Sequence, residues 1–141
     1  MSSPPGAARR SETMTATAAA ETAFRDALDE HLAALQARDA ARFAATLGED
    51  VAVVDGGGEI KRGTEAVLDS HAEWFALPVR WRFDYEVVLT RETASSGLAL
   101  LRVTYTHEPG AEAVRFLLSL VFERDEGEVF KFVYDQNTPL E

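Results

Sequence analysis

Apolar side chains recur at helical spacing in the first patterned part of the chain. From residue 21 onward one helical stripe is formed by Phe24, Leu28, His31 and Leu35, with Leu32 beside it. His31 is the polar member of this stripe. Residues 39–47 predict a second, short helix that Asp39 caps and Gly48 ends, with Phe43 and Leu47 facing inward. Residues 50–55 and 59–63 are expected to form two short strands.

A third helix is predicted to begin at Thr64 and to stop before Pro78. Its inward positions are Val67, Leu68, His71, Trp74 and Phe75. Residues 81–90 then alternate apolar and polar side chains with a period of two, which indicates a strand. Turn residues separate three further strands over 98–107, 113–123 and 129–137.

These elements predict an α+β fold, in which three N-terminal helices cover one face of a long, curved antiparallel sheet. The strand over 113–123 is apolar on both faces, because Leu117 and Val121 lie opposite the row that contains Phe116 and Leu118. Helices can cover only one of these faces. We therefore expect the other face to meet a second copy of the chain in a homodimer.

The composition suits one globular domain, which we place over residues 21–141 of the 141 in the chain. Residues 1–20 contain no large apolar side chain except two methionines, so a disordered tail is expected. Arg9 and Arg10 resemble an export signal, but the residues after them are polar, and a cytoplasmic location is favoured. Met14 is an alternative start of translation.

Charge and missing residue types exclude several classes of partner and chemistry. The net charge of -10 opposes binding to nucleic acid or to an anionic membrane surface, and no apolar run is long enough to span a bilayer. Because there is no cysteine, disulfides and thiolate chemistry are excluded. The chain also lacks the glycine-rich phosphate-binding motifs and the serine-hydrolase motif, and no cofactor is expected.

Two residues are the candidates for catalysis. His31 lies within an apolar stripe, where it is either a hydrogen-bonded core histidine or a proton donor that projects into a cavity. Asp55 precedes Gly56–Gly58, where it is either a turn residue or a general base at the rim of a pocket. Taken locally, both residues favour the structural interpretation.

Other polar and aromatic residues are candidates for contacts to a substrate. His71 lies on the inward side of the third helix and is either a second pocket residue or a structural histidine, whereas His107 is expected in a surface turn. Neither histidine belongs to a metal-binding motif, so no metal site is expected. In the last strand we expect one face to point inward, and it consists of Phe130, Phe132, Tyr134 and Gln136. The polar Tyr134 and Gln136 at the end of this face are candidates for the mouth of a pocket, where they would orient a ligand.

The run over residues 31–67, together with GEVFKFVYDQNTP near the C-terminus, resembles the NTF2-like superfamily, in particular its SnoaL-like and ketosteroid-isomerase-like branch. The resemblance spans residues 21–139. It implies a cone-shaped α+β barrel with a deep apolar pocket, frequently dimeric through the sheet. These motifs are specific for the fold and weak for activity.

Within this resemblance, Asp55 corresponds to the carboxylate that abstracts a proton in the isomerases. His31 corresponds to the tyrosine that donates a hydrogen bond to the enolate oxygen. Leu118 replaces their second donor, an aspartic acid. Since such a donor typically supplies about 3 kcal/mol to the transition state, the chain departs from a steroid isomerase.

The function expected is therefore general acid–base catalysis on a small, apolar carbonyl compound, as an isomerase, cyclase or dehydratase without a cofactor. Asp55 and His31 are the expected catalytic residues. The expected substrate contacts are His71, Trp74, Phe116, Leu118, Tyr134 and Gln136. The alternative is a module without catalytic activity that binds a ligand or assembles as a dimer.

Overall fold

The computed structural model describes residues 23–140. The predicted tail, with Arg9, Arg10 and Met14, lies outside them. Residues 23–36 are helical, and the helices α2 (Ala40–Ala45) and α3 (Thr64–Phe75) follow. The strands are β1 (Leu47–Val54), β2 (Ile60–Arg62), β3 (Arg82–Glu92), β4 (Ser96–Thr106), β5 (Val114–Arg124) and β6 (Phe130–Leu140).

The strands form one six-stranded sheet in the order β2-β1-β6-β5-β4-β3. The four long strands β3 to β6 make the expected antiparallel meander. β1 pairs with β6 in parallel, so that the sheet is mixed and open, a pairing that the turn signals did not predict. The α+β architecture inferred from the sequence is confirmed.

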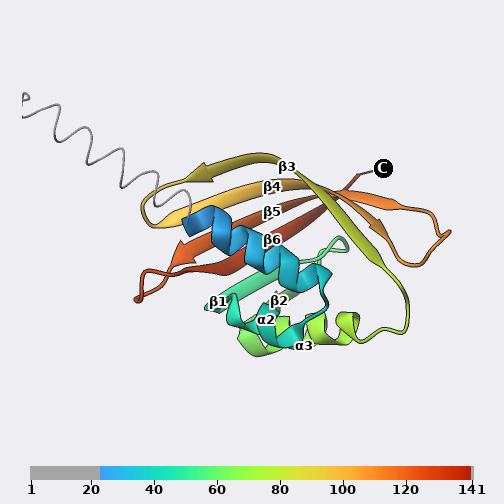
Figure 1. Cartoon of the computed structure of the whole chain (residues 1–141), viewed down its shortest axis with the longest axis horizontal. Helices are drawn as coiled ribbons and strands as arrows, with labels where there is room; N and C mark the ends of the chain where they lie inside the picture. Colours follow the sequence, from blue (N-terminus) through green and yellow to red (C-terminus); the bar gives the residue numbers. More distant parts are fainter. Residues whose placement is uncertain (1–22, 141) are drawn as a thin grey trace, which may run out of the picture.

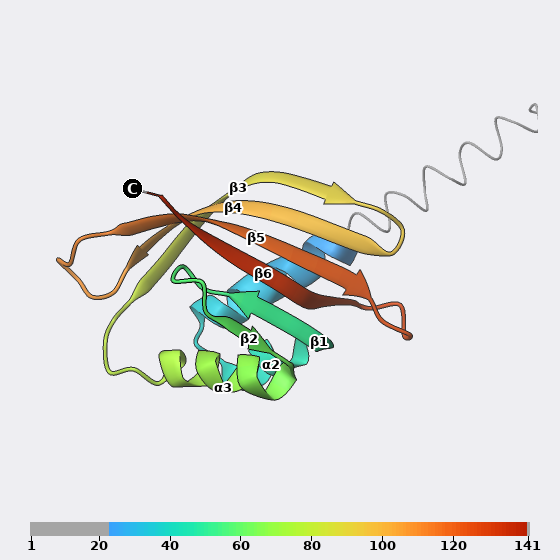
Figure 2. The same ribbon diagram turned by 180° about the vertical axis from the view of Figure 1, so that it is seen from behind.

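The helices gather on one face of this sheet. The helix over residues 23–36 lies across the long strands, while α2 and α3 lie beside β1 and β2 (Figure 1). Seen from behind, β4, β5 and β6 pass in front of that first helix (Figure 2). The whole predicted stripe of this helix is buried, because it is the surface that packs on the sheet.

Close packing of this helix on β4 requires a glycine. Gly97 pairs with Phe122 of β5, and a Cβ atom at Gly97 would overlap the ring of Phe24. The same ring meets Phe122 and Phe130 edge to face, with ring centroids 5.7 and 5.8 Å away. One end of the core is therefore an aromatic cluster fixed to the sheet.

The second helix is shorter than predicted. Asp39 caps α2 as expected, since its side chain accepts a hydrogen bond from the backbone amide of Arg42. The helix ends at Ala45, however, and Gly48 lies within β1 instead of ending the helix. A Cβ at Gly48 would come within 3.0 Å of a methyl group of Val133, so this glycine permits the close approach of β1 to β6.

Two strands contain an irregularity that changes which side chains face inward. In β3 the register shifts between Val87 and Leu89, and Leu89 is exposed where strict alternation predicted it inside. In β6 the register shifts at Val133, which has no partner of its own in β5. No helix in the described range 23–140 is long and apolar enough to cross a membrane.

Candidate functional site

A pocket of about 460 Å³ lies between the helices and the sheet. Its apolar wall includes Leu35, Val53, Phe83, Phe116 and Leu118. Its polar lining contains Asp55, Glu59, Lys61, Ser70, His71, Tyr105, Asp135 and Asn137. A largely apolar cavity of this size with a few polar groups is typical of a site for a small organic molecule.

Asp135 and Asn137 reach the pocket because of the bulge at Val133. Phe132 pairs with the inward Phe122, and one extra residue then separates it from Tyr134, which pairs with the outward Val121. Beyond the bulge the inward set is therefore Asp135 and Asn137, which pair with Leu120 and Leu118. Sequence reasoning assigned these two residues to the wrong face, because a period of two carries no sign of an inserted residue.

The same bulge removes two of the predicted substrate contacts. Tyr134 and Gln136 are not among the pocket residues, and they share the outer face of β6, where the Tyr134 hydroxyl donates to Gln136 Oε1 at 2.8 Å. The other four predicted contact residues, His71, Trp74, Phe116 and Leu118, do line the pocket.

The carboxyl group of Asp135 is the most perturbed acid among the residues described. Burial raises its pKa to about 7, because a low-dielectric surrounding disfavours the charged form. No ion pair or hydrogen bond within residues 23–140 offsets this effect. A carboxyl group that titrates near neutrality can both accept and release a proton.

Asn137 lies two residues further along the same strand. Its Oδ1 atom is enclosed without a hydrogen-bond partner, against the turn at Gly56, where a Cβ would come within 3.3 Å of it. The Nδ2 atom has no hydrogen bond and is not among the enclosed unpaired atoms of the described chain, so it keeps some accessible surface, and Asn137 lines the pocket. This amide nitrogen can donate to a ligand oxygen.

His71 is held in one tautomer by α3. Its Nδ1 atom lies 2.8 Å from the carbonyl oxygen of Val67, and a carbonyl can only accept, so Nδ1 carries the hydrogen. The ring stacks on Phe43 with centroids 4.5 Å apart. Burial lowers the pKa of His71, an effect that the hydrogen bond to Val67 partly offsets. The neutral ring therefore presents Nε2 as an acceptor.

An aromatic row with its own hydrogen bonds forms another side of the pocket. Trp74 stacks on Trp81 with centroids 4.3 Å apart and donates from Nε1 to the Tyr105 hydroxyl at 3.1 Å. That hydroxyl lies 2.8 Å from Nδ1 of His107. His107 lies exposed in a bend after β4, as expected from the sequence, and there contacts the hydroxyl of a pocket residue.

Asp55 lies at the rim of the pocket and serves the turn there. Its Oδ1 atom accepts hydrogen bonds from the backbone amides of Gly57 and Glu59, both at 2.9 Å. The side chain is exposed. This is the turn geometry that its sequence context favoured over the role of a base.

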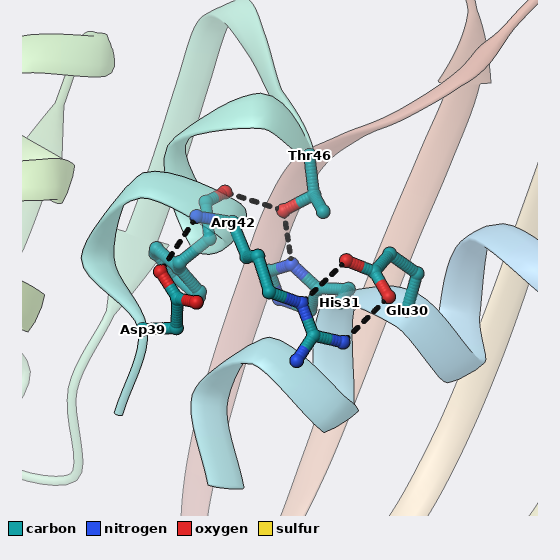
Figure 3. Close-up of polar contacts among 6 residues, drawn as sticks. Glu30, His31, Asp39, Arg42 and Thr46 are labelled. Atoms are coloured by element: carbon teal, nitrogen blue, oxygen red, sulfur yellow. Dashed lines mark hydrogen bonds and ion pairs between the residues drawn. The ribbon is translucent and has the colours of Figure 1, made fainter. Parts of the chain in front are cut away.

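His31 does not reach the pocket. It is only 2% exposed and lies between the rings of Phe43 and Phe132, with centroids 4.9 and 4.2 Å away. Its Nδ1 atom lies 2.7 Å from Oγ1 of Thr46, whose hydroxyl donates to the carbonyl of Phe43 (Figure 3). His31 is thus a donor to Thr46, and burial lowers its pKa to about 3.

The two predicted catalytic residues therefore do not face a common cavity. Asp55 caps a turn at the rim, and His31 is part of the core beneath Phe43. The pocket lining that contains Asp55 also contains His71, Asp135 and Asn137. Within residues 23–140 no group of three or more histidine and acidic side chains is arranged to hold a metal ion.

Comparisons with known proteins identify the fold. The family model for the SnoaL-like domain matches residues 28–132. Among solved structures, an NTF2-like protein of unknown function from Pseudomonas putida KT2440 has a TM-score of 0.75 at 14% identity, and the match covers 86% of this chain and 87% of that one. A comparison with curated proteins finds no match.

Two further structures are similar over most of the chain. An uncharacterized protein with a cystatin-like fold from Caulobacter vibrioides has a TM-score of 0.72 at 19% identity, covering 86% of this chain and 89% of that one. An LEH-like epoxide hydrolase from M. tuberculosis has a TM-score of 0.64 at 21% identity, covering 84% of each chain. At these identities the likeness is one of fold, and the match to the family model confirms the resemblance seen in the sequence.

The substitution Thr46→Val tests the role of the His31 contact. It leaves Nδ1 of His31 buried without a partner, so we expect the free energy of unfolding to fall by about 1–3 kcal/mol. Urea unfolding followed by circular dichroism measures this change. Thr138→Val on exposed β6 is the matched control and should change stability by less than about 0.5 kcal/mol. Equal stabilities of the two variants would contradict the assignment.

The pKa of Asp135 also predicts how stability depends on pH. The native state keeps this proton up to about pH 7, whereas an unfolded aspartate loses it near about pH 4. Because the native state then binds more protons, this group makes stability fall as pH rises through that window. Asp135→Asn should therefore stabilise the protein at about pH 8 by on the order of 4 kcal/mol, and little at about pH 4. Exposed Asp84→Asn is the control for urea titrations, and a pH-independent difference would argue against the shift.

Proposed function

This chain belongs to the SnoaL-like domain family, and on that premise we propose that its pocket binds a small, largely apolar carbonyl compound and moves a proton on it by general acid–base catalysis. The observation that carries the proposal is the carboxyl group of Asp135, which lines an apolar cavity and has a pKa of about 7. His71, Trp74, Phe116 and Leu118 are proposed as contacts of the substrate.

The proposed step begins with the ionised form of Asp135. The carboxylate takes a proton from the carbon next to the carbonyl group, and the C–H electron pair forms the carbon–carbon double bond of an enolate. The carbonyl oxygen gains the negative charge. Nδ2 of Asn137 is the donor proposed for that oxygen, in place of the donors that His31 and Leu118 do not supply. Where the substrate carries a carbon–carbon double bond next to the acidic carbon, the enolate is conjugated with it, and return of the proton to the far carbon of that bond shifts the double bond and completes an isomerisation.

A ligand-binding module without catalytic activity is the second candidate. The enclosed, unpaired Oδ1 atom of Asn137 and the missing second acidic residue at Leu118 favour it over an efficient isomerase. The two candidates differ in one measurable respect. Both bind an apolar ligand in the pocket, but only an enzyme exchanges the acidic hydrogens of a bound ketone.

Exchange of α-hydrogens in D₂O tests the proposed function. A panel of cyclic ketones that includes α-tetralone is incubated with the protein, and loss of the α-proton signal is followed by NMR. We expect the rate of exchange to rise as the pH passes through about 7, because Asp135 then ionises. Asp135→Asn should lower the rate at least about a hundredfold.

The exposed Asp84, which forms an ion pair with Arg82, supplies the matched control Asp84→Asn, whose rate should equal that of the wild type. Retained exchange in the Asp135→Asn protein would exclude Asp135 as the base. Binding of the ketones by the wild type without exchange would support the module without catalytic activity.

We further propose that the outer face of the sheet forms a homodimer. Beyond the ion pair of Arg102 with Glu86, this face carries a row of partly buried or exposed apolar side chains, which are Leu89, Leu98, Leu100, Leu117 and Val121. Such a continuous apolar surface is seldom left in water.

Sedimentation of the wild type at micromolar concentration should give the mass of a dimer. Val121→Glu in the centre of the apolar row should give a monomer, since dimerisation would bury its charge. Val129→Glu, at an exposed valine beside the last turn, should remain dimeric. A monomeric wild type would contradict this proposal.

A further inference from the structure

Most of the side chains with hydrogen-bond donors that line the pocket have a partner within the protein. Ser70 donates to the carbonyl of Val67 at 2.9 Å, and Lys61 donates to Glu59 at 2.7 Å. Trp74 donates to the Tyr105 hydroxyl at 3.1 Å, and that hydroxyl lies 2.8 Å from Nδ1 of His107. Two groups keep unused donor hydrogens: the Lys61 ammonium, which has three N–H groups and only Glu59 as a partner, and Nδ2 of Asn137, which has no hydrogen bond among the described residues. A ligand therefore finds few donors here.

Another residue of the pocket lining, His71, has a free acceptor. Nδ1 of His71 is committed to Val67, so Nε2 is the basic nitrogen of the neutral ring. Nε2 has no hydrogen bond among the described residues, and it is not one of their enclosed unpaired atoms. Since His71 lines the pocket, this acceptor is accessible from the cavity.

The free groups come from two different walls. His71 belongs to α3, whereas Asp135 and Asn137 belong to β6 of the sheet. A ligand that contacts Asn137 and Asp135 with its carbonyl end thus presents another part of its skeleton to the helix. That part meets an acceptor on a ring that lies among the aromatic side chains of Phe43, Trp74 and Phe75.

We propose that the ligand is a hydroxylated carbonyl compound, whose hydroxyl group donates a hydrogen bond to Nε2 of His71 while its carbonyl oxygen accepts one from Asn137. The substrate class rests on the proposed function, since the carbonyl end is the one that Asp135 acts on. His71 is a specificity-determining residue in this arrangement. It selects a ketone that carries a hydroxyl group over the same ketone without one.

The preference follows from what a ligand without a hydroxyl group would do to His71. Such a ligand displaces water from Nε2 and returns no donor, so the acceptor stays unpaired in an apolar site. A site built to hydrogen-bond a hydroxyl group discriminates strongly against the analogue that lacks it. The lowered pKa of His71 agrees with this role, because the neutral ring keeps its lone pair at neutral pH.

The experiment compares two probes, α-tetralone and its 4-hydroxy derivative, by measuring their dissociation constants with isothermal titration calorimetry. The wild type should bind the hydroxy ketone about tenfold more tightly. His71→Phe keeps an aromatic ring for the stack on Phe43 and removes the acceptor, so its preference should fall below about twofold. His71→Gln, which restores an acceptor oxygen, should recover part of the preference.

A second arm separates this inference from the proposed function. Asp135→Asn should lose α-hydrogen exchange and keep the binding preference, because His71 is unchanged. Exposed Asp84→Asn should behave as the wild type does in both measurements. Equal binding of the two probes by the wild type, or an undiminished preference in a folded His71→Phe protein, would overturn the role of His71. If the wild type prefers the hydroxy ketone but does not exchange the α-hydrogens, the catalytic proposal is contradicted and the role of His71 stands.

Discussion

One inserted residue in the last strand determines what the pocket contains. The bulge at Val133 lets β6 present Phe130 and Phe132 to the core at one end and Asp135 and Asn137 to the cavity at the other. Without it, Tyr134 and Gln136 would point inward and both polar residues of the site would face outward. The position is supported from β1, where Gly48 makes room for the Val133 side chain. The carboxyl group of Asp135 thus depends on a local packing detail two residues away.

The two buried histidines have different roles because their surroundings differ. Both are neutral at physiological pH because burial lowers their pKa values. His31 is enclosed by aromatic rings and joins the first helix to Thr46 at the end of α2, which makes it a structural element of the core. His71 makes one hydrogen bond within its own helix and keeps its other nitrogen for the cavity.

Patterns of hydrophobic residues predicted every helix and long strand in the described range, since burial of one face leaves a periodic trace in the sequence. They did not predict the parallel pairing of β1 with β6, because pairing between segments far apart in the chain leaves no local trace.

Of the residues that line the candidate site, the sequence predicted His71, Trp74, Phe116 and Leu118. Asp135 and Asn137 were missed because a bulge shifts the alternation without a recognisable residue type, and the local reading of Asp55 as a turn residue agrees better with the geometry than the role implied by family resemblance.

The placement of β1 between β2 and β6 has a consequence for biosynthesis. On the ribosome, β1 emerges long before β6, and until then its only neighbour in the sheet is the three-residue β2. Until β6 has been made, the nascent chain therefore carries an unpaired edge of β1 and three helices without their full packing surface. The pocket is completed only when β6 has been made, because β6 supplies Asp135 and Asn137 to its lining. Binding of a ligand therefore cannot assist folding before that point.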